Sequence, residues 1–191
     1  MFRQRHISQY LNAKNVQRVF TALVLITVLV IVSVFALNYT KLQKPLNRII
    51  DQDARNNGVH ATVYFDSFID TKIIVFDVRA IGPPAGPAGV FRAFFQFARE
   101  LQGRKIEEVV LAFRGKPKLK LNGDDFLALG ASFGTMQPKK LLWELARNLR
   151  LPNGKLVISH VPGNYAAMLQ KNLGEVSESQ AASDLLKNIT Q

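Results

Sequence analysis

Four basic side chains recur at alternate positions and are the most distinctive chemical feature of this sequence. They are Arg114, Lys116, Lys118 and Lys120, called the basic row below. Residues of one parity on a β-strand project from one face, so the row predicts a cationic surface for lipid headgroups, an acidic polymer or an acidic protein. Lysines beside a proline are also typical of an edge strand protected against pairing with another chain. Both interpretations stay open, and edge protection is the simpler one.

A second group of residues suggests acid–base chemistry. Asp124 and Asp125 are adjacent carboxylates after an Asn-Gly turn, and His160 lies further along the chain. A hydrolase-like enzyme would use Asp124, Asp125 or His160, and a pocket that joins at least two of them would support it. In the competing interpretation, the two carboxylates cap a helix and interact with its dipole. His160 follows Ser159 directly, and neighbours on a strand point to opposite faces, which argues against a Ser–His pair.

Signatures of cofactor and metal binding are missing from the sequence. It has no cysteine, which excludes disulfides, thiol nucleophiles and Cys-ligated zinc. The three histidines, at positions 6, 60 and 160, lack metal-ligand spacing. The Gly/Pro-rich loop at 82–89 has no Gly-Lys-Ser/Thr ending, and its prolines lack the N–H groups that hold a phosphate. We therefore predict no catalytic residue, no metal and no cofactor.

Apolar segments separated by turns predict the elements that carry these residues. Strands are expected at 60–68, 72–80, 109–113, 116–121 and 155–160, and helices at 88–102, 124–133, 138–149 and 178–189. Phenylalanines trace one face of the helix at 88–102, which predicts packing on a sheet in preference to an aromatic ligand pocket or a membrane-facing surface. Val90 and Phe97 fall beside this face and are candidates for a surface patch. The order favours an α+β domain with a small, mostly antiparallel sheet of four or five strands packed by helices.

Before this domain, residues 19–37 form an apolar run without charge, proline or glycine. At about 1.5 Å per residue, a helix of this length spans roughly 28 Å, close to the hydrocarbon core of a bilayer. The run therefore predicts a transmembrane helix. A cleaved signal peptide is the competing interpretation, because Val34-Phe35-Ala36 has suitable residues for a signal peptidase. The run is, however, longer than the apolar part of most signal peptides.

Charge sets the expected orientation. The net charge is +11, and residues 1–59 contribute +6 of it, from eight basic and two acidic side chains. Arg3, Arg5, Lys14 and Arg18 precede the apolar run without any acid, which places the N-terminus in the cytoplasm. Four further basic residues between 41 and 55 weaken this bias. The domain would then lie outside the cytoplasm, where nucleic acid is not the expected partner.

The chain thus divides into four expected parts. These are a basic cytoplasmic tail (1–18), a transmembrane helix (19–37), a juxtamembrane connector (38–58) and an extracytoplasmic α+β domain (59–191). In the connector, Leu46, Ile49 and Ile50 predict a short amphipathic helix that begins at Pro45. This helix would either bind lipid or a partner, or pack on its own domain, and the second interpretation is favoured.

One resemblance concerns the second half of the chain. The segments LAFRGKPK at 111–118 and GDDF at 123–126, with Leu129-Gly130, are similar to segments of small uncharacterised bacterial envelope proteins. The resemblance implies a location but no activity. We expect a single-pass protein of the cytoplasmic (inner) membrane that contacts the bilayer through 19–37 and presents a non-enzymatic interaction or assembly domain to a protein partner. The alternatives are an anchored hydrolase-like enzyme and a secreted soluble domain.

Overall fold

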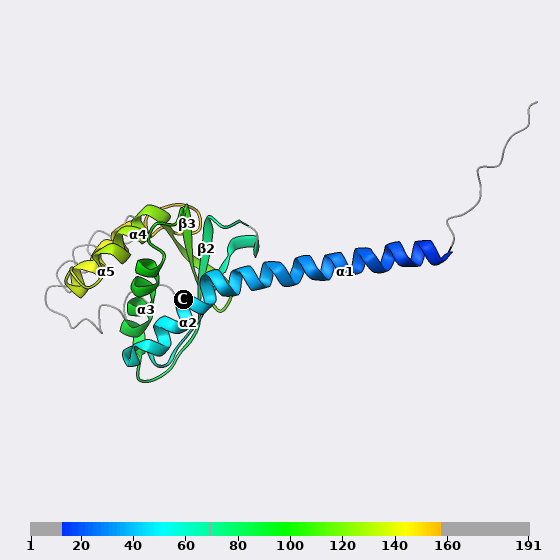
Figure 1. Ribbon diagram of the computed structural model, residues 1–191. Helices are drawn as coiled ribbons and strands as arrows, with labels where there is room; N and C mark the ends of the chain where they lie inside the picture. Colours follow the sequence, from blue (N-terminus) through cyan, green and yellow to red (C-terminus); the bar gives the residue numbers. More distant parts are fainter. Residues whose placement is uncertain (1–12, 69, 158–191) are drawn as a thin grey trace, which may run out of the picture. The chain divides into compact units, whose positions relative to one another are not determined.

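The computed structural model describes residues 13–68 and 70–157 (Figure 1). The chain forms two compact units, Met1–Leu37 and Asn38–Gln191.

The first unit contains one long apolar helix, α1, which covers Ala13–Asn38. Its large apolar side chains are exposed in every direction, from Val16 to Leu37. The hydroxyls of Thr21, Thr27 and Ser33 donate hydrogen bonds to backbone carbonyls four residues earlier, so these polar groups have partners within the helix. The helix is long and apolar enough to cross a membrane, and a signal sequence would meet the same criteria.

The second unit is built on a four-stranded sheet of order β1-β2-β3-β4. The strands are β1 (Val59–Phe65), β2 (Ile73–Ile81), β3 (Glu108–Phe113) and β4 (Lys116–Asn122). The outer pairs are antiparallel and the central pair β2–β3 is parallel. Parallel neighbours need a crossover connection, which α3 (Gly86–Glu100) supplies. The expected α+β fold with a mostly antiparallel sheet is confirmed.

Helices pack on one face of this sheet (Figure 1). They are α2 (Lys44–Gln52), α3, α4 (Gly123–Ser132) and α5 (Pro138–Asn148). Phenylalanine rings fill the core, and Phe76 of β2 meets Phe94 of α3 edge to face with ring centres 5.2 Å apart. Phe97 is fully buried and Val90 nearly so. The surface patch expected for these two residues is therefore wrong, because both side chains belong to the core, where Phe97 packs against Phe76 of β2 and Phe126 of α4.

The connector belongs to the folded unit. It forms a short π-helix, η1 (Tyr39–Gln43), followed by α2. Leu42 and Leu46 are fully buried, and Ile49 and Ile50 pack against the same core. The apolar face of this helix thus packs on its own domain, as expected.

Polar side chains of the connector also cover the outer edge of β1. The Asn38 Oδ1 atom accepts a hydrogen bond from the Phe65 backbone N–H at 2.8 Å. Gln43 accepts from the Val63 N–H at 2.8 Å and donates to the Ala61 carbonyl at 3.3 Å. Unpaired edge groups invite pairing with other chains, and these side chains occupy them.

The strand expected at 155–160 is not formed in the part of it that the structure describes. Leu156 forms an isolated bridge with Arg150, outside any strand. Arg150 pairs in turn with Lys120 on the outer edge of β4, through two backbone hydrogen bonds of 2.8 Å. Residues 158–160 and the helix expected at 178–189 lie outside the described residues.

Candidate functional site

The basic row does not lie on a single strand. Arg114 and Gly115 form the two-residue turn between β3 and β4, with φ values of 51° and 80°. Positive φ at both positions is typical of a type I′ hairpin turn, which explains the glycine. The Arg114 guanidinium lies over the Phe113 ring, 5.1 Å from its centre, and its Nε donates to the Arg79 carbonyl. Arg114 is therefore a turn residue.

A β-bulge separates the three lysines of the row. Phe113 pairs with Lys116, and Leu111 pairs with Leu119, which leaves Lys118 as the extra residue between them. Directly opposed residues project to the same face of a sheet. Lys116 thus shares the face of Phe113, whereas Lys120 shares the opposite face with its partner Val110. The expectation that the whole row shares one face is wrong, because the bulge shifts the alternation.

The lysines also differ in their partners. The Lys120 Nζ lies 2.8 Å from the Glu108 Oε1, and both side chains are partly buried. Neither Lys116 nor Lys118 forms an ion pair with a carboxylate of the described residues. Since β4 is an edge strand of the sheet, the placement of these two lysines fits edge protection.

The paired carboxylates lie at the start of α4. Asp124 is exposed and Asp125 is half-buried, and both lie in the first helical turn, where the dipole favours negative charge. The side chain that caps this helix is that of Asn122, whose Oδ1 accepts from the Asp124 N–H at 2.9 Å. His160 lies outside the described residues. Within the described ranges, no cluster of three or more His, Asp or Glu side chains could hold a metal.

Asp77 of β2 is a buried carboxylate that was not singled out in the sequence. Its side chain is fully buried and pairs with the Arg79 guanidinium at 2.6 Å. Both carboxylate oxygens accept from the Gly115 N–H at 3.0 Å, so Asp77 holds the β3–β4 turn. Burial raises the pKa of the neighbouring Tyr64 hydroxyl, and the negative charge of Asp77 adds to this effect. The Asp77 carboxylate thus has its partners within the sheet, in Arg79 and the Gly115 N–H, and stabilises the sheet.

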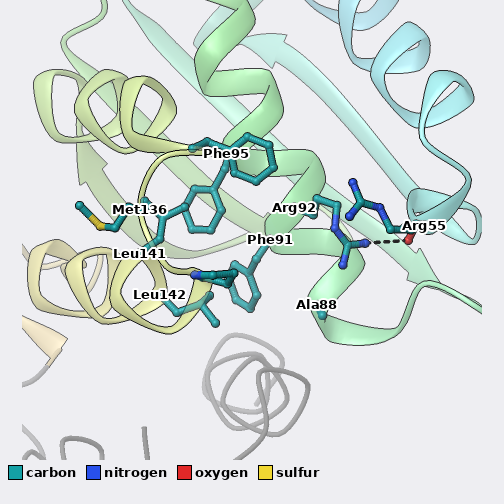
Figure 2. A pocket seen from close by; sticks show the side chains of 11 residues that line it. Arg55, Ala88, Phe91, Arg92, Phe95, Met136, Leu141 and Leu142 are labelled. Atoms are coloured by element: carbon teal, nitrogen blue, oxygen red, sulfur yellow. Dashed lines mark hydrogen bonds between the residues drawn. The ribbon is translucent and has the colours of Figure 1, made fainter. Parts of the chain in front are cut away.

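A cavity of about 350 Å³ lies between α3, α5 and the loop after α4 (Figure 2). Most of its lining is apolar and comes from Ala88, Phe91, Phe95, Phe133, Met136, Pro138, Leu141 and Leu142. Two guanidinium side chains, Arg55 and Arg92, lie together on one side of it (Figure 2). This arrangement, called the arginine-rimmed pocket below, combines an apolar wall with a cationic rim.

Local sequence features position the walls of this pocket. α3 and α5 both have proline in the first turn, where a missing N–H costs no helical hydrogen bond. Between α4 and α5, Gly134 adopts a φ of +94°, which other residues rarely reach. The Met136 N–H donates to the Ser132 carbonyl at 2.9 Å and closes this turn. The turn brings Phe133 and Met136 against α3, where the Phe133 and Phe95 rings stack with centres 6.3 Å apart.

The two rim arginines differ in their electrostatic environment. Arg55 forms two parallel hydrogen bonds with Asp53, Nε to Oδ1 at 2.9 Å and Nη2 to Oδ2 at 2.8 Å. These hydrogen bonds hold the pKa of the Asp53 carboxyl far below its usual range, and a hydrogen bond from Gln96 adds to the effect. Arg92 donates from Nη1 to the Arg55 carbonyl at 3.0 Å. It forms no ion pair with a carboxylate in the described part of the chain.

The pocket could not be found from local sequence patterns. Arg55 and Arg92 are separated by 37 positions, and the apolar lining residues have the spacing of ordinary core residues. The comparisons add no family: no protein-family model, no curated protein and no solved structure matches this chain. Its class is defined by its own structure, an α+β unit that follows a helix suited to a membrane.

Proposed function

We propose that the chain is a single-pass protein of the bacterial cytoplasmic membrane that presents its α+β unit at the outer face as a non-enzymatic binding module. The observation that carries this proposal is the apolar surface of α1, which is exposed all round and so suits lipid rather than a protein core. The basic tail before α1 supports a cytoplasmic N-terminus.

The proposal takes the anchor over a cleaved signal peptide because the apolar run is longer than the apolar part of most signal peptides. α1 continues through Val34, Phe35 and Ala36 and ends at Asn38. A cut after Ala36 would thus fall inside a helix, two residues before Asn38, whose side chain accepts from the Phe65 N–H of β1.

Thiol labelling tests the orientation. The parent chain has no cysteine, so Gln4→Cys and Lys105→Cys give single labelling sites before and after α1; Lys105 is exposed. We expect a membrane-impermeant thiol reagent to label Lys105→Cys but not Gln4→Cys in intact cells, with each chain at full length by mass. Both variants should react after the cells are broken, which is the control. Labelling at position 4 alone would show that the N-terminus lies outside and the α+β unit inside, which contradicts the proposal. A shortened chain released from the membrane would show that the domain is secreted.

A further inference from the structure

We propose that the arginine-rimmed pocket binds a medium-chain fatty acid, with the acyl chain between α3 and α5 and the carboxylate on Arg92. The proposal rests on the role of the unit as a binding module and names the ligand class. It does not depend on which side of the membrane the unit occupies.

The size of the pocket fits a small ligand. Its volume of about 350 Å³ lies at the lower end of the range of about 300–1,000 Å³ typical of small-molecule sites. If each atom group of a ligand occupies about the volume of one water, ~30 Å³, the pocket holds on the order of a dozen groups. An acyl chain of about ten carbons with its carboxylate has this size.

The charges at the rim favour one negative charge. Among the described residues, the lining contains two cations and no carboxylate. Asp53 already neutralises Arg55 through two hydrogen bonds, so within the described part of the chain Arg92 is the rim cation without a carboxylate partner. A guanidinium has five N–H donors, and the described residues engage Arg92 only through its Nη1 bond to the Arg55 carbonyl. The remaining donors can bind a carboxylate in the two-pronged geometry that arginine favours.

The walls select against polar ligands and peptides. Phe91, Met136 and Leu142 offer no hydrogen-bonding groups, so a sugar or a bound peptide backbone would bury unpaired polar atoms there. An acyl chain carries none. The flexible thioether side chain of Met136 also adapts well to an apolar chain. The pocket therefore suits an apolar body with a single charged end.

The test uses the full chain in nanodiscs of zwitterionic lipid and decanoate labelled with ¹³C at its carboxyl carbon. We expect an NMR signal of bound decanoate that saturates and is absent from empty nanodiscs. Arg92→Gln should weaken decanoate binding by about tenfold or more, because a charge-assisted hydrogen bond is lost. Decanol, which has the same chain without the charge, should bind wild type and Arg92→Gln equally. Arg147→Gln on the exposed side of α5 is the matched control and should leave decanoate binding unchanged.

A second variant tests the apolar part of the pocket. Ala88→Phe adds a ring to the wall and should reduce binding of both decanoate and decanol, while circular dichroism verifies the fold. Absence of a bound decanoate signal in the wild type would overturn the proposal. Equal decanoate affinity of wild type and Arg92→Gln would also overturn it, as would binding of a peptide carboxylate in place of decanoate. Purified nanodiscs expose both faces, so these failures are distinct from a reversed orientation in the labelling experiment.

Discussion

Among the single residues of the unit, Asp53 connects the chain after α2 with α3. Its carboxylate accepts hydrogen bonds from the Arg55 backbone and side chain and from the Gln96 amide. Gln96 in turn accepts from the buried amide of Asn56 at 2.7 Å. One carboxylate thus holds together residues more than 40 positions apart in sequence, and its charge state should affect the stability of the fold.

The depressed pKa of Asp53 predicts a stability effect that depends on pH. A group whose pKa is lower in the folded than in the unfolded chain stabilises the fold above its unfolded pKa, here close to the ordinary value of 3.8. This contribution is lost as the pH falls toward the folded pKa. We expect Asp53→Asn to lower the free energy of unfolding by about 1–3 kcal/mol at pH 7 and by less at pH 3. Urea unfolding at both pH values measures the difference.

Asp51→Asn is the control for this prediction. Asp51 is exposed on α2, so its replacement should change the free energy of unfolding by less than about 0.5 kcal/mol. An Asp53→Asn effect that is equal at both pH values would show that the side chain acts by shape and not by its charge.

At the scale of elements, the two edges of the sheet are protected against pairing with another chain in different ways. The β1 edge is covered by the side chains of Asn38 and Gln43. The β4 edge is bridged at Lys120 by Arg150, whereas Lys116 and Pro117 are exposed beyond the bulge at Lys118. Charges, proline and bulges all oppose pairing with a second chain.

Replacement of Lys116 and Lys118 by threonine should therefore promote self-association. Threonine keeps a high strand propensity but removes the charges that oppose edge pairing. Analytical ultracentrifugation of the full chain in a non-ionic detergent would detect larger species. The double variant Lys139→Thr, Lys140→Thr, which removes two charges from α5, should remain like wild type. An unchanged oligomeric state together with loss of an anionic partner would instead support the basic row as a binding surface.

The same elements show what the sequence can and cannot predict. The spacing of apolar residues predicted α3 and α5 to within a few residues, because helix faces are local patterns. The prediction that Lys116, Lys118 and Lys120 share one face was wrong. Their spacing does not reveal the bulge, which is determined by pairing with Leu111 and Ala112 of another strand. The pocket and the Asn38–Phe65 contact join distant positions and leave no periodic signal.

At the scale of the whole molecule, the folded unit begins earlier than its first strand. Residues 38–58 are polar in sequence, so the sequence predicts a connector there and a domain that starts at Val59. In the structure, Leu42 and Leu46 of this segment are fully buried, and Gln43 completes the edge of β1. A chain beginning at Asn38 should therefore fold without α1.

A chain beginning at Val59 should be much less stable. Loss of a buried leucine costs about 2–5 kcal/mol, so the loss of Leu42 and Leu46 together approaches the total stability of about 5–15 kcal/mol of a typical domain. We expect the chain from Asn38 to unfold cooperatively in urea and the chain from Val59 to be partly unfolded without denaturant. Leu46→Ala in the longer chain is an intermediate case that should lower the midpoint without abolishing the transition. Equal stability of the two chains would mean that residues 38–58 only link the anchor to an independent domain, because burial of both leucines would then contribute nothing to folding.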